Sequence, residues 1–251
     1  FLTLRLSAEF MRQIALIVED DPATRHVIVS TLATAGIESL IADSAAAMWR
    51  QMGENPDVVI LDLGLPDADG FELLRRLRQQ SDVPVLIHST RSEEIERIIG
   101  IEIGADDFLP KPCNMRELLA RTRSLLRRAK GRPSQNGGRP GCLLRFGDWV
   151  LDPAGRVLTN KDGQPVALGV SAFALLSEFL ENPFLPLSRE ILSRALKREY
   201  VAYDRIIDVH VSQIRRLLGN QPDGSGYIKT FRSQGYVFTS TVERSDAAES
   251  V

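Results

Sequence analysis

The chain has 251 residues, of which 43% are hydrophobic and 25% are charged, and its formal net charge is −2 at pH 7. This composition is typical of a globular protein and excludes a disordered chain, and the length suggests one large or two ordinary domains. No apolar run approaches the roughly 18 residues of a membrane span, and two cysteines give neither a metal-binding spacing nor a disulfide framework. We therefore expect a cytoplasmic protein without a membrane partner.

A run of glycine, proline and polar residues, "GRPSQNGGRPG" at 131–141, is typical of a flexible linker and divides the chain. Residues 11–130 carry 15 Lys+Arg against 19 Asp+Glu, whereas residues 142–240 carry 12 against 10. The positive balance of the second part suggests a contact with nucleic acid. We predict domains at 11–130 and 142–240, with an N-terminal extension or upstream remnant at 1–10 and a disordered polar tail at 241–251.

The first domain alternates strand and helix patterns five times, which predicts βαβ units around a parallel sheet. The expected strands are Ile14–Val18, Ser39–Ala42, Val58–Leu61, Pro84–His88 and Asp107–Leu109. The third strand is apolar throughout, a pattern typical of a strand that is covered on both faces. Its last residue is followed at once by a carboxylate, which raises the question of what that charge does at the end of a buried strand.

Polar residues follow four of the five strands. Glu19 and Asp20 follow the first strand, Asp62 the third, Ser89 the fourth and Lys111 the fifth. The carboxyl ends of parallel strands share one edge, and a strand order of 2-1-3-4-5 would make the first and third strands neighbours there. Clustered carboxylates repel each other unless a cation lies among them, and oxygen ligands favour Mg²⁺.

This arrangement predicts phosphoryl transfer to a carboxylate, because a metal ion and a lysine can neutralise the phosphoryl oxygens while the carboxylate attacks. Each residue taken singly has another interpretation as a helix cap, a turn residue or a solvated charge.

The second domain begins with short strands over 143–168, separated by "DPAG" and "KDGQP" turns, which predict an antiparallel sheet. Three helices are expected near Ser171–Glu181, Ser188–Leu196 and Asp204–Leu218. A hairpin follows at 227–238, with a glycine near its turn. Three helices and a terminal hairpin predict a winged-helix module.

Two families are recognisable from these motifs. Residues 11–130 resemble the receiver domain of two-component response regulators through "LIVEDD", "VVILDLGLPDADG" and "GADDFLPKP". Residues 142–240 resemble the winged-helix effector of the OmpR/PhoB subfamily, with "IKTFRSQGYVF" as its signature. The resemblance implies a doubly wound, flavodoxin/CheY-like α/β receiver with a five-stranded parallel sheet, joined to a small α+β winged-helix domain. It also implies a non-enzymatic regulator that a histidine kinase phosphorylates and that binds promoter DNA.

The resemblance assigns roles to individual residues. Asp62 would accept the phosphoryl group, Lys111 would form a salt bridge to it before a cis bond to Pro112, and Ser89 and Phe108 would act as switch residues. The implied Mg²⁺ ligands are Asp20, Asp62, the carbonyl of Gly64 and, through water, Glu19.

Phosphorylation would favour a homodimer through a face of mixed charge, here called the dimer face. Its implied residues are Arg97, Ile98, Ile101, Glu102, Asp106, Asp107, Glu117, Leu119, Arg121 and Arg123. Ile98, Ile101 and Leu119 would form an apolar patch, and Arg97–Glu117 and Asp107–Arg121 would pair between the two chains.

The helix near Asp204–Leu218 would read DNA, with an apolar stripe of Ile206 or Ile207, Val211, Ile214 and Leu218 turned to the core. The implied DNA contacts are Arg205, His210, Ser212, Gln213 and Arg215, together with Arg232 in the hairpin. Ser212 and Arg215 would contact phosphates, Gln213 and His210 would reach base edges, and Arg232 would enter the minor groove. Paired direct repeats are the expected site, and RNA polymerase is a further candidate partner.

Two alternatives stay open. An orphan regulator would bind DNA without phosphorylation, and Thr90, beside the switch hydroxyl where a small residue is usual, leaves room for that function. An aspartyl-phosphate phosphatase or hydrolase is the second alternative. Enzymes of the haloacid dehalogenase type carry an aspartate two residues after the nucleophile, where this chain has Gly64.

Cys113 replaces a more usual aromatic residue and is interpreted as a small core residue.

Overall fold

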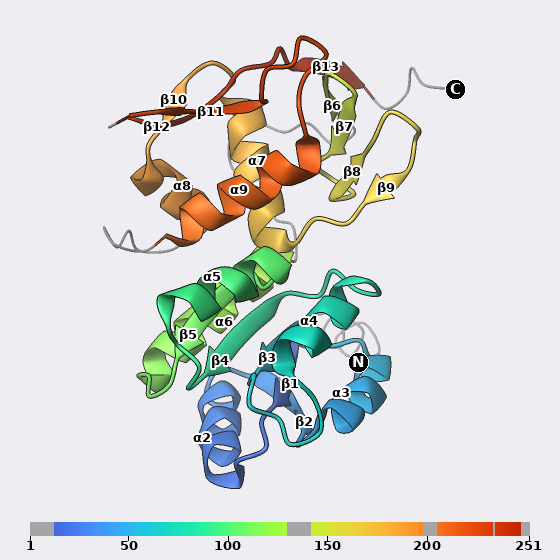
Figure 1. Ribbon diagram of the computed structural model, residues 1–251. Coiled ribbons are helices and arrows are strands. Elements are labelled where there is room, and N and C mark those ends of the chain that lie inside the picture. Colours follow the sequence, from blue (N-terminus) through green and yellow to red (C-terminus); the bar gives the residue numbers. More distant parts are fainter. Residues whose placement is uncertain (1–12, 130–141, 198–204, 233, 247–251) are drawn as a thin grey trace, which may run out of the picture. The chain divides into compact units, whose positions relative to one another are not determined.

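The computed structural model describes residues 13–129, 142–197, 205–232 and 234–246. The chain falls into two compact units, Phe1–Ala129 and Lys130–Val251 (Figure 1). The predictions for residues 1–10 and for the linker at 131–141 lie outside the described residues.

The N-terminal unit alternates strands and helices along the chain. Its elements are β1 (Gln13–Val18), α2 (Pro22–Ala33), β2 (Ile37–Ala42), α3 (Ala45–Gln51), the 3-10 helix η1 (Met52–Glu54), β3 (Val58–Leu61), α4 (Gly70–Arg78), β4 (Val85–Ser89), α5 (Glu94–Ile103), β5 (Asp107–Pro110) and α6 (Met115–Ala129). The strands form one parallel sheet in the order β2-β1-β3-β4-β5, which confirms the predicted order. The apolar residues of β3 are all buried, as the unbroken hydrophobic run predicts.

Side-chain caps fix where the helices of this unit begin. Asp21 accepts a hydrogen bond from the Thr24 N–H at 2.7 Å and so caps α2, with Pro22 in the first turn. Asp69 caps α4 in the same way. The Asp21 cap leaves only three residues between β1 and α2, so Glu19 and Asp20 stay at the edge of the sheet.

The C-terminal unit contains two antiparallel sheets and three helices among its described residues. Its elements are β6 (Cys142–Phe146), β7 (Trp149–Asp152), β8 (Val157–Thr159), β9 (Pro165–Val166), α7 (Val170–Glu181), β10 (Pro186–Leu187), α8 (Arg189–Ala195), α9 (Ile206–Leu218), β11 (Ile228–Phe231), β12 (Gly235–Phe238) and β13 (Glu243–Asp246). The sheet orders are β13-β6-β7-β8-β9 and β10-β12-β11. This is the expected winged-helix domain (Figure 1).

The C-terminal tail differs from the prediction. Residues 241–251 were expected to be disordered, yet Glu243–Asp246 forms β13 and pairs antiparallel with β6. The pairing uses backbone N–H and C=O groups, which an edge strand would otherwise leave without partners. A polar sequence therefore does not prevent this strand from forming.

Three aromatic rings join the first sheet of the C-terminal unit to the hairpin. Phe146 lies edge-on to Tyr227 and to Phe238, with ring centroids 5.8 Å and 5.5 Å apart. Tyr227 and Phe238 stack on each other at 6.0 Å. The hairpin is thus packed against the body of the unit by its first and last residues.

A buried ion pair ties α4 to the start of β4 and to β5. The Arg78 guanidinium donates to Asp106 Oδ2 at 3.0 Å and to the Gly104 and Val83 carbonyl oxygens at 2.7 Å. Asp106 Oδ2 also accepts the Val85 N–H at 3.0 Å, and Asp106 is only 1% exposed. Asp106 therefore faces the interior of this unit, and its assignment to the dimer face is wrong.

Replacing Asp106 with alanine should lower the free energy of unfolding by about 3–5 kcal/mol, because it leaves a buried guanidinium without its charge partner. The urea unfolding transition of the N-terminal unit measures this loss. Arg75→Ala is the matched control, since the Arg75–Glu72 pair is exposed and contributes no more than about 1 kcal/mol. Equal losses in both variants would contradict the role given to the buried pair.

Candidate functional site

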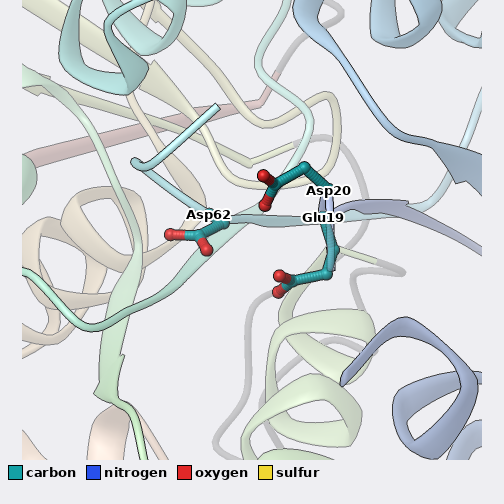
Figure 2. Close-up of side chains that lie close together, drawn as sticks. All are labelled: Glu19, Asp20 and Asp62. Carbon is teal, nitrogen blue, oxygen red and sulfur yellow. The ribbon is translucent and has the colours of Figure 1, made fainter. Parts of the chain in front are cut away.

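Three carboxylates lie close together where β1 and β3 end (Figure 2). Glu19 and Asp20 follow β1, Asp62 follows β3, and one oxygen from each lies within 4.8 Å of the others. The parallel ladder continues past the strand ends, because the Asp62 N–H donates to the Val18 carbonyl at 2.9 Å. Backbone pairing therefore places these side chains together before any ligand is considered.

Lys111 brings the fifth strand to the same place. Its Nζ lies 2.6 Å from Glu19 Oε2 and 2.5 Å from Asp62 Oδ2. Its backbone N–H donates to the Ser89 carbonyl at 2.9 Å, and the peptide bond to Pro112 is cis, as predicted. One ammonium group thus bridges two carboxylates that come from different strands.

The environments of the two bridged carboxylates differ. Burial opposes the charge of Asp62, but hydrogen bonds from Lys111, Ser89 and the Gly64 N–H outweigh burial and lower the pKa of Asp62. Burial raises the pKa of Glu19, the lysine only partly offsets that, and the Asp62 charge adds to it. Asp62 is therefore the better ionised of the two, which suits a nucleophile.

The donor set fits a hard divalent cation. Oε1 of Glu19 is buried without a hydrogen-bond partner among the described residues, an arrangement that costs free energy unless a ligand occupies it. Asp20 is exposed and leaves the cluster open to solvent. Oxygen ligands alone favour Mg²⁺. The predicted ligand Gly64 lies at this edge, where its N–H donates to Asp62 Oδ1 at 3.1 Å.

The two predicted switch residues are both buried. Ser89 ends β4, and its hydroxyl accepts the Arg91 N–H at 3.3 Å. Phe108 lies beside Ile87 in the β4–β5 register. Thr90, between Ser89 and Arg91, is exposed. The neighbouring threonine is thus turned away from the interior.

Sequence reasoning missed Arg91. Its guanidinium binds Glu96 at 2.8 Å and Asp69 at 3.1 Å, and lies 4.8 Å from the centre of the Phe71 ring. It joins the loop after Ser89 to the loop after Asp62. Nothing in the local spacing indicated this contact, because Asp69 lies 22 residues earlier in the chain.

The charges of the dimer face pair within the chain. Arg121 binds both oxygens of Asp107 at 3.0 Å and Glu117 Oε1 at 2.6 Å. Asp107 is buried and also accepts the Phe108 N–H. The predicted intermolecular Asp107–Arg121 pair would have to replace this contact.

The apolar part of the dimer face needs a correction. Ile101 is fully buried, because it lies on the side of α5 that packs inward. Ile95 and Ile99 are instead 57% and 38% exposed. Ile98 and Leu119 are half-buried, as surface residues of such a patch can be.

The apolar stripe of α9 is buried as predicted, from Ile206 to Leu218. His210 lies with this stripe and is only 1% exposed, so its assignment as a base contact is wrong. His210 lies two residues after Asp208, on the side of α9 that faces the core. Arg205, Ser212 and Arg232 are exposed, and Gln213 is half-buried.

Arg215 ties α9 to the hairpin. Its guanidinium donates to the Ile228 carbonyl at 2.9 Å and to Thr230 Oγ1 at 2.7 Å, and lies 5.4 Å from the Tyr236 ring centre. The sequence suggested a phosphate contact for Arg215 and gave no sign of this role.

A second tie joins α8, α9 and β12. Asp208 Oδ1 accepts hydrogen bonds from Arg189 at 2.7 Å and from the Tyr236 hydroxyl at 2.5 Å. Burial and the Asp208 carboxylate raise the pKa of Tyr236 to about 12. These contacts hold α9 and β12 of the hairpin together.

Comparisons with known proteins follow the two units. Residues 15–123 match the response regulator receiver domain, and residues 163–238 match the family described as transcriptional regulatory protein, C terminal. The transcriptional regulatory protein AruR of Pseudomonas aeruginosa is 37% identical over 231 residues, which cover 89% of this chain and 95% of AruR. The regulatory protein VirG of Agrobacterium fabrum is 40% identical over 242 residues, which cover 95% and 94%.

A solved structure of a RitR mutant shares the fold, with a TM-score of 0.73 over 91% of this chain and 100% of that one. At 17% identity this likeness concerns the fold alone. Within the described residues, no helix is both long and apolar enough to span a membrane.

Replacing Lys111 with methionine should raise the pKa of Asp62, because burial then acts with less opposition. Because the pKa of Asp62 is lowered in the folded protein, its carboxylate stabilises the fold at pH values above the unfolded-state pKa. This contribution is lost as the pH falls through the folded-state pKa. The variant has a smaller contribution of this kind and should therefore lose less stability over the same pH range. Carbon NMR titration of the Asp62 carboxyl measures the shift. Ser89→Ala keeps the lysine and should raise the pKa by less, so a larger rise there would contradict the assignment.

Proposed function

Because this chain belongs to the family of two-component transcriptional response regulators with an OmpR/PhoB-type DNA-binding domain, we propose that Asp62 accepts a phosphoryl group from a histidine kinase. This family consists of DNA-binding regulators and not of enzymes, so the hydrolase alternative does not fit. The contact of Lys111 with both Asp62 and Glu19 carries the proposal. Through this contact, the positive charge of Lys111 already lies beside the Asp62 oxygen that would attack the phosphoryl group.

Receiver domains bind Mg²⁺ through acidic residues, and Glu19, Asp20 and Asp62 would hold it here, with the Gly64 carbonyl as a further ligand. When bound, the ion would offset the charge on the phosphoryl oxygens. An Asp62 carboxylate oxygen would attack the phosphorus of a phosphohistidine in line, as the P–N bond breaks and the imidazole leaves. Lys111 would turn from the carboxylate pair to the transferred phosphoryl oxygens.

The Ser89 hydroxyl would then donate to a phosphoryl oxygen and leave the Arg91 N–H. Phe108, beside Ile87, would follow this movement within the core. The change would favour a homodimer in which Arg121 exchanges its own carboxylates for those of the partner. The proposed dimer face loses Ile101 and Asp106 and gains the exposed Ile95 and Ile99. The buried Asp107 stays in it only through its pair with the partly exposed Arg121, and the other members are kept.

The second part of the proposal concerns DNA. Ser212 and Gln213 lie away from the buried stripe of α9, which supports their entry into the major groove. Arg205 and the hairpin residue Arg232 are exposed and suit phosphates and a narrow minor groove. A phosphate contact of Arg215 would have to form while its guanidinium still donates to the Ile228 carbonyl in the hairpin. Paired direct repeats are the proposed site, with RNA polymerase as a further partner.

Asp62→Asn should abolish acid-labile phosphate incorporation from a small phosphodonor with Mg²⁺, since an amide is not a nucleophile of this kind. Asp57→Asn is the matched control, because Asp57 lies at the other end of β3 and accepts a hydrogen bond from the Ile14 N–H. Calorimetric titration should show weaker Mg²⁺ binding by Asp20→Ala. Labelling of Asp62→Asn at the rate of the control would overturn the acceptor assignment.

Gln213→Ala should lose preference at one base position, by roughly 1–3 kcal/mol, while the salt dependence of binding stays unchanged. Arg205→Ala should weaken binding to all sequences and reduce the salt slope by about one unit, because its proposed contact is with phosphate. Selection from random DNA followed by anisotropy titrations at several salt concentrations separates the two effects. Unchanged base preferences in Gln213→Ala would mean that another residue reads the groove.

A further inference from the structure

A histidine and a cysteine meet beside the acidic cluster, and phosphoryl transfer uses neither of them. His88 Nε2 on β4 lies 3.3 Å from the Sγ of Cys113, which follows Pro112 in the loop after β5. His88 is 2% exposed, whereas Cys113 is half-buried. The thiol therefore gives a route from solvent to the buried imidazole.

The buried imidazole is costly if its role is only to fill space. Its other ring nitrogen, Nδ1, is buried without a hydrogen-bond partner among the described residues, so its desolvation is not offset. An apolar side chain would pack there without this cost. Burial and the nearby Lys111 charge lower the pKa of His88 to about 4, so the ring is neutral at physiological pH. A neutral imidazole is the form that binds metal ions.

The thiol is poorly suited to oxidation. Burial and the Glu117 charge raise the pKa of Cys113, so the thiol stays protonated near neutral pH. Peroxides react with the thiolate, whereas a thiophilic metal ion displaces the thiol proton directly. The imidazole nitrogen 3.3 Å away offers a metal ion a second ligand, which a peroxide would not use, so the pair is better matched to a metal ion than to an oxidant.

The spacing of the two atoms fits a tetrahedral ion. Bonds of about 2.3 Å from zinc to sulfur and about 2.0–2.1 Å to nitrogen place these two ligands about 3.5 Å apart in a tetrahedral site. The observed 3.3 Å needs only a small adjustment.

Glu117 can supply a third ligand. It acts electrostatically on the thiol, and its side chain is 46% exposed. Arg121 binds its Oε1, so Oε2 is the atom that can turn toward the sulfur. Glu117 reaches the pair only after this rotation.

We propose that Cys113 and His88, with Glu117 as third ligand, bind a borderline divalent cation of the Zn²⁺ class at a site separate from the acidic cluster. Binding replaces the Cys113 thiol proton, which is released to solvent. The fourth position faces the solvent side of the thiol. A nitrogen and sulfur donor set selects such an ion over Mg²⁺, which prefers oxygen.

The test uses Co²⁺ as a spectroscopic probe of the full chain, with excess Mg²⁺ to occupy the acidic cluster. Cys142→Ser removes the other cysteine and should keep a thiolate-to-cobalt charge-transfer absorption that Zn²⁺ abolishes. Adding Cys113→Ser should remove the absorption. Adding His88→Leu or Glu117→Gln should weaken Co²⁺ binding at least about tenfold. Glu117 is on the surface, so Glu117→Gln tests the site even if His88→Leu does not fold.

Absorption that survives Cys113→Ser, or that is absent from the Cys142→Ser protein at saturating Co²⁺, would overturn the proposal. So would equal Co²⁺ affinity of Glu117→Gln and its parent. None of these measurements involves phosphate, so the result stands apart from the fate of the Asp62 assignment. Asp62→Asn should keep the full cobalt absorption, which distinguishes the thiol site from the acidic cluster.

Discussion

A single ammonium group organises the acidic edge of the N-terminal unit. Lys111 lies between Glu19 and Asp62, two carboxylates that the sheet forces together because β1 and β3 are neighbours. Without a cation, their mutual repulsion would add to the cost of burying both. The lysine satisfies one oxygen of each and leaves Glu19 Oε1 without a hydrogen-bond partner among the described residues, a position that a metal ion would complete. The repulsion that Lys111 relieves and the oxygen atom left open for a metal ion thus have one cause, which is that the sheet brings Glu19 and Asp62 together.

Arginines also join elements of this unit that are distant in sequence, Arg91 beside the site and Arg78 at the opposite edge of the sheet, where β4 and β5 begin. Arg78 anchors the start of β4, Arg91 joins the loops after Ser89 and Asp62, and Arg121 holds Asp107 at the start of β5. The contacts differ in burial, and hence in how readily they can change. Arg78 is enclosed and serves the fold, whereas the contacts of Arg91 and Arg121 are nearer to solvent and are the ones that a phosphoryl group could redistribute.

The C-terminal unit uses the same means for a different purpose. Arg215 and the Asp208–Tyr236 contact fix α9 against the hairpin, so the side chains that would meet a groove and a phosphate have a defined spacing. A helix that is anchored on two sides has less conformational freedom to lose on binding. Residues of α9 that do not reach DNA would therefore contribute to the proposed reading of DNA by holding the helix in place.

The sequence by itself determined the strands of the N-terminal unit and their acidic edge, because these depend on local periodicity and on the rule that parallel strands end on one side, whereas the strand order followed from the family resemblance. The buried stripe of α9 was predictable from the same kind of periodicity. The tertiary structure alone decided what each polar or apolar residue faces once the helices pack. Ile101, Asp106 and His210 turned inward, β13 paired with β6, and Arg121 found partners in its own chain. Burial and pairing depend on contacts between residues far apart in the sequence, and a periodic pattern specifies a face of a helix without specifying what covers it.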